Sequence, residues 1–261
     1  MDAANTAPVL SRRPIAHLAI PVPDVVRESR TVHWQEAAKD SEALRPMLLD
    51  QLRHEDFRGQ HVLDVGTGEG RLAFAVARLG GRVVGVDLDR NRLAHARAYA
   101  GVLDIRHAEF VWGDVEKTPY HEFSTEPFDA VVSNLCMAPE IVWHASRALR
   151  PGGGFIFCCH HGDHWRETRR GSRWAFYEDT MAELLAENRF GVEFMGVDTT
   201  VAQFDELREV RLFLRDATVR KWVEDGRWDE LVDSFGRGEK HLTFSYLIVK
   251  ARRVPAEYKA E

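Results

Sequence analysis

Cysteine is scarce in this chain of 261 residues, so a disulfide framework is not expected. The three cysteines are Cys136, Cys158 and Cys159, an odd number that leaves at least one thiol unpaired. Cys158 and Cys159 are adjacent in a strand-like segment, so we expect their side chains to point to opposite faces of a sheet. Buried, reduced thiols are the simplest interpretation. They favour a reducing compartment, which predicts a cytoplasmic protein.

The chain also lacks the features of membrane proteins and of nucleic-acid-binding proteins. No apolar run reaches the length of about 20 residues that a membrane-spanning helix needs. Residues 1–30 contain no continuous apolar core of a signal peptide. The net charge of −6 argues against a basic face that would neutralise phosphates. We therefore expect neither a membrane nor a nucleic acid among the partners.

Glycine, in contrast, is concentrated where it can shape a ligand site. The segment H-V-L-D-V-G-T-G-E-G-R-L at 61–72 joins an apolar run containing Asp64 to a turn with alternating glycines and then to a helical pattern. A second apolar run ends on Asp87. A strand, a glycine turn, a helix and a strand that closes on an acid are typical of a nucleoside-binding half-site. The glycines let backbone approach a ligand, and the Asp87 carboxylate suits the two hydroxyls of a ribose.

The spacing of these glycines disfavours a nicotinamide dinucleotide. A dinucleotide-binding turn has the pattern G-x-G-x-x-G, in which the third glycine allows a close contact between helix and strand. Here the pattern is G-x-G-x-G, and Arg71 occupies the position of that third glycine. An NAD(P)-dependent oxidoreductase is therefore the weaker interpretation of this segment.

The segment instead resembles motif I of the class I S-adenosylmethionine-dependent methyltransferases, and further markers of that family follow in order. They are Asp87, Asp114 in F-V-W-G-D-V, the strand-like F-D-A-V-V-S-N at 128–134 and the turn R-A-L-R-P-G-G-G-F at 147–155. The resemblance covers residues 60–160, and a segment at 242–250 suits the closing strand of the family. It implies an α/β fold: a Rossmann-like three-layer sandwich around a mostly parallel seven-stranded sheet, with an antiparallel C-terminal strand, N-terminal helices and a helical insertion before the last strand.

The resemblance implies S-adenosyl-L-methionine as the cofactor and gives roles to residues at the strand ends. The glycine turn passes the methionine part, where the Asp64 carboxylate complements an ammonium group. Asp87 takes the ribose, while Asp89 is better placed to cap the following helix. Leu88 packs on the adenine, and Asp114 accepts from the adenine amino group. The predicted cofactor-binding residues are Asp64, Gly66, Thr67, Gly68, Gly70, Asp87, Leu88, Asp114, Val115 and Asn134.

Catalytic residues are less apparent, because methyl transfer from a sulfonium is an in-line displacement that positioning alone can promote. A base is needed only when the accepting atom arrives protonated. The candidates are His160, His161 and His164 in C-C-H-H-G-D-H-W, just past a predicted strand, with His160 and His161 preferred. The H-H-x-x-H spacing could suggest a metal, but the metal-dependent branch of the family uses acids and an amide, so we expect none. The N-P-P-Y signature of enzymes that methylate exocyclic amines is absent at Asn134, which disfavours a nucleobase acceptor.

The chain is expected to fold as a single methyltransferase domain at 25–261, after a flexible N-terminal arm at 1–24 that is rich in proline. Residues 25–54 are predicted to form two helices broken near Pro46, and 60–160 the cofactor-binding core. Residues 161–240 belong to the acceptor side. Within them, 205–240 is an amphipathic insertion that is either a lid over the acceptor or a helical decoration packed on the sheet. Trp112, in a predicted strand, is expected in the core.

The function that fits best is transfer of a methyl group to an O, N or C atom of a small-molecule acceptor. We expect this reaction in secondary or cofactor metabolism, catalysed by a monomer or a homodimer. Three alternatives stay open. They are an enzyme of the same fold that transfers or cyclises the aminocarboxypropyl arm of the same cofactor, an NAD(P)-dependent oxidoreductase, and a non-catalytic cofactor-binding protein. A fold does not by itself determine which of these a chain does.

Overall fold

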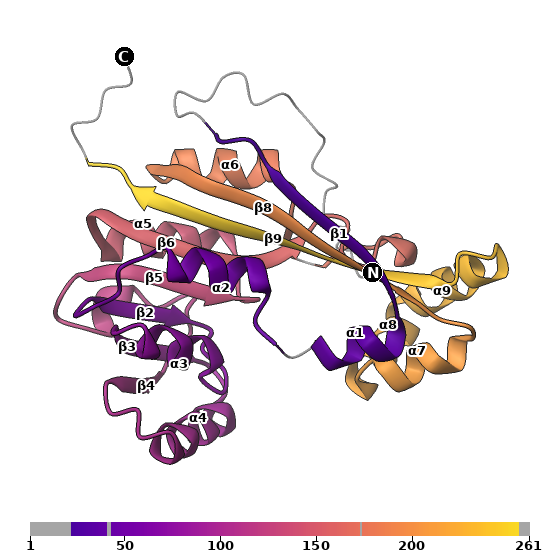
Figure 1. Ribbon diagram of the computed structural model, residues 1–261, viewed down its shortest axis with the longest axis horizontal. Helices are drawn as coiled ribbons and strands as arrows, with labels where there is room; N and C mark the ends of the chain where they lie inside the picture. Colours follow the sequence, from indigo (N-terminus) through magenta and orange to yellow (C-terminus); the bar gives the residue numbers. More distant parts are fainter. Residues whose placement is uncertain (1–21, 41–42, 173, 256–261) are drawn as a thin grey trace, which may run out of the picture.

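The computed structural model describes residues 22–40, 43–172 and 174–255, which form a central sheet with helices packed against it (Figure 1). The predicted arm at 1–24 lies almost entirely outside these residues. The described strands are β1 (Val26–His33), β2 (His61–Val65), β3 (Arg82–Asp87), β4 (Ala108–Trp112), β5 (Phe128–Asn134), β6 (Leu149–His161), β7 (Ala175–Phe176), β8 (Phe190–Gln203) and β9 (His241–Arg253).

Helices alternate with these strands along the chain. The α-helices are α1 (Trp34–Asp40), α2 (Pro46–Arg53), α3 (Arg71–Arg78), α4 (Arg90–Val102), α5 (Pro139–Ala148), α6 (Glu178–Glu187), α7 (Leu207–Phe213), α8 (Asp216–Asp225) and α9 (Arg227–Gly236), and two short 3₁₀ turns lie at Tyr120–Glu122 and Arg166–Thr168. Across the described residues, none of these helices combines the length and the apolar character needed to cross a bilayer.

The strand order is that of the predicted fold with two additions. Within the described residues, the sheet runs β4-β3-β2-β5-β6-β9-β8-β1, with β7 beside β6. The strands from β4 to β6 pair in parallel, whereas β9 is antiparallel to both β6 and β8. The seven expected strands correspond to β2 through β6, β8 and β9, which confirms the mostly parallel sheet with its antiparallel C-terminal strand. β1 and β7 were not expected.

Apolar runs form the central strands because both faces of the sheet are covered. Every residue of β2 is buried, and so is every residue of β3 after Arg82, as is typical of a parallel sheet between helices. On α3 the side chains of Leu72 and Val76 face this core. Cys158 and Cys159 pack into different core clusters, as the alternation of strand side chains predicts. Both thiols are free.

The N-terminal segment corrects the prediction of two helices at 25–54. Residues 26–33 form β1, which pairs in parallel with β8 over its whole length. The helices begin only after it, and Pro46 starts α2 instead of breaking a helix, because a first-turn position has no intrahelical N–H bond to lose. The side chains of β1 are almost all exposed, so no alternating burial marks it in the sequence. It forms because the edge of β8 offers unpaired backbone groups.

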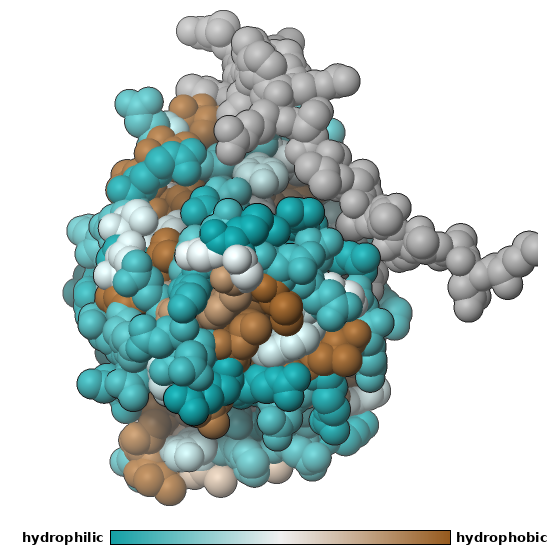
Figure 2. Space-filling model, turned by 90° about the vertical axis from the view of Figure 1, so that its right-hand side faces the viewer, coloured by the Kyte–Doolittle hydropathy of each residue, from teal (hydrophilic) through white to brown (hydrophobic). Residues whose placement is uncertain are grey.

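The insertion at 205–240 forms α7, α8 and α9 at one end of the long strands (Figure 1). Trp222 of α8 is fully buried, and it shares a core cluster with Phe204 after β8 and with Leu242 of β9. Figure 2 views the molecule from this end and shows a mainly hydrophilic surface with small groups of hydrophobic side chains. The exposed apolar residues there include Leu212 and Val223. The helices of the insertion are thus anchored on the sheet by an apolar core of their own.

Trp112 was expected in the core but lies at the surface. It ends β4, which is the edge strand of the sheet, and it is 48% exposed. Its indole N–H donates to the Leu88 carbonyl oxygen at 3.0 Å, and the Arg90 guanidinium lies 4.2 Å from the ring centroid. An edge strand has a covering neighbour on one side only, so the preference of tryptophan for the core is not decisive there.

Candidate active site

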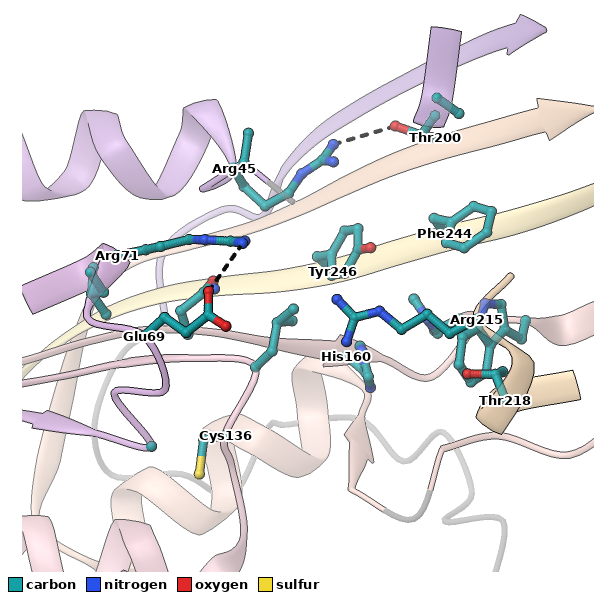
Figure 3. A pocket seen from close by; sticks show the side chains of 18 of the residues that line it. Arg45, Glu69, Arg71, Cys136, His160, Thr200, Arg215, Thr218, Phe244 and Tyr246 are labelled. Atoms are coloured by element: carbon teal, nitrogen blue, oxygen red, sulfur yellow. Dashed lines mark hydrogen bonds and ion pairs between the residues drawn. The ribbon is translucent and has the colours of Figure 1, made fainter. Parts of the chain in front are cut away.

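The carboxyl ends of β2, β3, β5 and β6 meet at one edge of the sheet. Ligands of open α/β sheets bind at such an edge, where neighbouring strands lead off in opposite directions. A cavity of about 660 Å³ lies there (Figure 3). It is lined by the glycine turn, these strand ends, the segment before α2, β9 and the corner between α7 and α8. Of the predicted cofactor-binding residues, those that line it are Asp64, Gly66, Thr67, Asp87 and Asn134.

The turn between β2 and α3 requires glycine for steric reasons. Gly66, Gly68 and Gly70 have φ angles of +69°, +55° and +86°, a region that disfavours any residue with a Cβ. A Cβ at Gly66 would also overlap the Cys136 side chain, and one at Gly68 would overlap the Arg92 guanidinium. Of the three glycines, Gly66 lines the cavity, while Gly68 and Gly70 do not; they allow the turn to pack against the neighbouring side chains.

Asp64 is a buried carboxylate with an unused acceptor. It is 1% exposed, and Thr67 Oγ1 donates to its Oδ2 at 2.6 Å. Its Oδ1 has no hydrogen-bond partner within the described part of the chain. Burial raises the pKa of Asp64 to about 7. Hydrogen bonds to this carboxylate from the Thr67 hydroxyl and from the Ala73 backbone N–H oppose this effect, and the Asp87 carboxylate adds to it. Buried polar atoms are normally satisfied, so this oxygen suits a donor from a ligand, above all a cationic one.

Asp87 supports the glycine turn from the end of β3. Its Oδ2 accepts from the Gly68 N–H at 2.8 Å, and its Oδ1 accepts from the Asp89 N–H at 2.8 Å. Each oxygen of a carboxylate has a second lone pair for a ligand hydroxyl. Asp89 in turn accepts from the N–H groups of Asn91 and Arg92 at 2.8 and 3.2 Å. This confirms Asp89 as the N-cap of α4; Asp87, and not Asp89, lines the cavity.

The residues predicted to hold an adenine lie beside this cavity and do not line it. Leu88 is 59% exposed next to Trp112. Asp114 accepts from the Lys117 ammonium group at 2.9 Å, which lowers the pKa of the Asp114 carboxyl. Val115 is buried. Leu88 and Asp114 therefore follow the ends of β3 and β4 at the surface, whereas the Val115 side chain packs in the core.

Two of the candidate histidines, His160 and His164, line the cavity. The Nδ1 of His160 lies 3.2 Å from Ser172 Oγ, and its ring stacks on His164 with centroids 4.1 Å apart. Burial lowers the pKa of His160 to about 4 and the pKa of His164 well below its usual range. Both imidazoles are therefore neutral at pH 7, the form that accepts a proton. A pKa this low also makes His160 a weak base.

His161, the other predicted catalytic residue, does not line the cavity. It is 2% exposed, with its Nε2 3.1 Å from Glu178 Oε2 and its Nδ1 3.2 Å from Ser245 Oγ. Glu178 also pairs with Arg27 of β1. These contacts tie β6 to α6, β9 and β1. Successive side chains of a strand alternate in direction, so only one of the two adjacent histidines reaches the cavity.

The other part of the wall contains residues that sequence reasoning missed. Arg45 Nε lies 2.6 Å from Asp198 Oδ2, and its guanidinium is 4.9 Å from the centroid of the Tyr246 ring. Arg30 of β1 and Arg215 before α8 line the same region, and Figure 3 shows the Arg215 side chain extending toward Tyr246. No local motif marks these residues, because they come from segments far apart in the chain.

One cluster outside the cavity has the spacing of a metal site. Ligand atoms of His33, Asp205 and Glu209 lie within 4.8 Å of one another. The Glu209 carboxylate already accepts from the N–H groups of Asp205 and Glu206 at 2.7 and 3.2 Å, which caps α7. The cluster lines no part of the active-site cavity.

Residues 56–188, about half of the chain, match the family of methyltransferase domains. The chain belongs to the class I S-adenosylmethionine-dependent methyltransferases. S-adenosylmethionine is the cofactor of this enzyme family. The Rossmann-like sheet and the glycine turn described above are the parts of the molecule that carry this membership.

Named relatives of this methyltransferase are similar over part of their length. The chain is 39% identical over 102 residues to the ribosomal protein L11 methyltransferase of Thermus thermophilus, covering 36% of each chain. It is 33% identical over 123 residues to the ubiquinone biosynthesis O-methyltransferase of Nitrosococcus oceani, covering 44% of this chain and 50% of that one. The match therefore spans half or less of these relatives.

A solved structure shows the same fold over a larger part of the chain. It is that of a candidate methyltransferase from Bacillus halodurans, with a TM-score of 0.61 and 21% identity. The match covers 79% of this chain and 99% of that one. At this identity the likeness shows the fold and leaves the acceptor open.

Proposed function

We propose that this protein transfers a methyl group from S-adenosylmethionine to a small-molecule acceptor in secondary or cofactor metabolism. One observation carries the proposal: a single cavity runs from the glycine turn and Asp64 to the corner of the insertion at Phe213 and Thr218. Its volume of about 660 Å³ lies within the range of about 300–1,000 Å³ that is typical of small-molecule sites. A cofactor at the glycine turn leaves the other end for the acceptor.

The groups at the glycine turn fit the cofactor. Asp64 would accept from the amino group of the methionine part, which its unpartnered buried oxygen supports. Asp87 would accept from the ribose hydroxyls, and Leu88, Asp114 and the backbone N–H of Val115 would hold the adenine. Bound there, S-adenosylmethionine supplies a methyl group on a positively charged sulfur. The remaining predicted contacts would come from the backbone of the glycine turn and from Asn134 at the end of β5.

Positioning is the main contribution of the protein to such a transfer. The accepting atom, the methyl carbon and the sulfur must lie in line, and correct placement of two reactants can supply about 7–11 kcal/mol. Trp165, Phe213 and Phe244 line the acceptor end and would exclude water from it. Where the accepting atom is a hydroxyl, His160 is the side chain placed to take its proton. Its effect would be below the ~10²–10⁴-fold of a base whose pKa lies near 7, because burial lowers the pKa of His160 to about 4. His161 would act only by holding β6 in place.

The two relatives do not indicate which acceptor this protein uses, because one is named for a ribosomal protein and the other for ubiquinone biosynthesis. We favour a small molecule because residues of the insertion, from Phe213 to Thr218, line the acceptor end. A protein side chain would need a more open approach. We further propose that the protein is a monomer or a homodimer. We place it in the cytoplasm, and the three free thiols support this location.

A mass-resolved assay tests this function. The protein is incubated with a metabolite extract and with S-adenosylmethionine whose methyl group is labelled. A product that gains one labelled methyl group in place of hydrogen, with release of S-adenosylhomocysteine, supports the proposal. Gain of the aminocarboxypropyl arm, with release of methylthioadenosine, would replace it with the alternative chemistry. In parallel, S-adenosylhomocysteine should raise the Tm and NAD should not; the reverse result would refute the cofactor.

A further inference from the structure

Charge is distributed unevenly along the cavity wall. The acidic residues that line it all lie at the glycine-turn end: Asp64, Glu69 and Asp87. The acceptor end is lined instead by three arginines: Arg30, Arg45 and Arg215. Among the described residues, no acidic side chain lines that end. A positively charged sulfonium is accommodated at one end of the cavity, and a negatively charged group suits the other.

Two of these arginines converge on one hydroxyl. Arg30 Nε donates to Thr200 Oγ1 at 3.2 Å, and Arg45 Nη2 donates to the same oxygen at 3.3 Å. Arg30 and Thr200 are register partners in β1 and β8, and Asp198 holds Arg45 from the same strand at 2.6 Å. Both guanidinium groups are therefore held in fixed positions by the sheet. A fixed pair of this kind is pre-organised for an anion.

Arg215 approaches from the opposite side, on the insertion. It is the residue before α8, and Figure 3 shows its guanidinium extending into the space near Tyr246 and His160. Trp165 lines the same space, and its buried indole N–H has no hydrogen-bond partner in the described residues. Together with Phe213 and Phe244, these rings make the acceptor end aromatic as well as cationic.

We infer that the acceptor carries an anionic group, a carboxylate or a phosphate, on an aromatic or similarly flat apolar body. The inference rests on the proposed function, because it concerns the acceptor end of the same cavity. Guanidinium groups match both anions with paired N–H donors, and the aromatic rings suit a flat body. The carboxylate of the cofactor itself would be served by a different part of the wall, because Arg71 and Arg92 line the glycine-turn end.

Matched probes test this inference by calorimetry on the full chain saturated with S-adenosylhomocysteine. The probes are benzoate, phenyl phosphate and indole-3-acetate, compared with the neutral benzamide and indole-3-acetamide. At least one anion should bind about tenfold or more tightly than the neutral amide with the same ring, and added salt should reduce this preference. Tighter binding of phenyl phosphate than of the carboxylates would identify the anionic group as a phosphate, and the reverse order would identify it as a carboxylate. Equal affinity for anions and amides, or no binding of any probe, would overturn the inference.

Variants assign the preference to the arginines. Arg30→Gln and Arg215→Gln should each reduce anion affinity about tenfold and leave amide affinity unchanged. Arg220→Gln is the matched control, because Arg220 is exposed on α8 and does not line the cavity. Arg45 is left intact, since its removal would strand the buried Asp198 carboxylate.

The affinity for S-adenosylhomocysteine separates this inference from the proposed function. This affinity should be unchanged in both variants. A reduced affinity would mean that the arginines bind the cofactor, which would refute the inference. If S-adenosylhomocysteine fails to bind the wild-type protein at all, the proposed function fails instead. An anion preference that persists in both variants would refute the assignment to Arg30 and Arg215.

Discussion

Asp64→Asn is the substitution that tests the glycine-turn site most directly. Burial raises the pKa of Asp64 from an ordinary 3.8 to about 7. One pKa unit corresponds to about 1.4 kcal/mol, so at neutral pH and above this shift lowers the unfolding free energy of the ligand-free protein by on the order of 4 kcal/mol. Asparagine has the same shape, can accept the Thr67 hydroxyl hydrogen bond and carries no charge. The substitution therefore removes the cost of a buried charge without opening a cavity.

The pH dependence of this effect has a definite sign. Because the folded pKa of Asp64 is raised, the folded state holds the proton more tightly than the unfolded state does. The resulting stabilisation is complete below the unfolded pKa, and it is lost as the pH rises through the folded pKa of about 7. Ligand-free Asp64→Asn should match the wild type in acid. Above neutral pH it should be more stable, by up to about 4 kcal/mol.

With the cofactor bound, the wild type should be more stable than Asp64→Asn, because the amino group of the cofactor pairs with the ionised carboxylate. Wild-type affinity for S-adenosylhomocysteine should rise with pH, and Asp64→Asn should bind it about tenfold or more weakly. Urea unfolding from acidic to mildly alkaline pH, with and without the ligand, measures both effects. A variant no more stable than the wild type in alkali would refute the burial argument. Normal ligand affinity would refute the contact.

Three further predictions concern the turn and the insertion. Asp87→Ala should weaken S-adenosylhomocysteine binding about tenfold or more in calorimetry, whereas Asp89→Ala should cost about 1 kcal/mol in urea unfolding with near-normal affinity; equal, small affinity losses would contradict this division. Gly68→Ala, at a φ of +55°, should lower the Tm and the ligand affinity together, because alanine is strained there; an unchanged Tm would be incompatible with this turn. Thr218→Trp should fill the acceptor end and reduce methyl transfer in the extract assay, with unchanged affinity for S-adenosylhomocysteine. The control Val223→Trp, at an exposed position of α8, should leave both methyl transfer and this affinity unchanged. Normal methyl transfer by Thr218→Trp would refute the hypothesis that the insertion covers the acceptor.

The cofactor end was predictable because its contacts are local in the sequence. Gly68 and Asp87, which share a hydrogen bond, belong to one strand–helix–strand unit, and the glycine spacing is sufficient to distinguish that unit from a dinucleotide site. Asp89 was predictable as a cap because capping depends on the next few residues only. The same locality explains one ambiguity. Strand alternation shows that only one of His160 and His161 can face the cavity, but a sequence does not show which.

The acceptor end was not predictable, because no local pattern brings its residues together. Arg30 reaches Thr200 only because β1 pairs with β8, and the exposed side chains of β1 leave no periodicity that would identify a strand. Arg45, directly before α2, contacts Asp198 of β8 although the two residues lie far apart in the sequence. An edge strand whose partner is distant depends on the completed sheet for its conformation.

The alternatives of lid and decoration for the insertion do not exclude each other. Its helices bury Trp222 against Phe204 and Leu242, as a decoration would, while the corner from Phe213 to Thr218 lines the cavity, as a lid would. Deleting all of 205–240 would uncover that apolar cluster, so loss of folding would say nothing about the acceptor. Within the corner, Phe213 and Leu214 pack against that cluster, whereas Thr218 does not. A substitution at Thr218 therefore tests whether the insertion covers the acceptor while leaving the anchoring contacts in place.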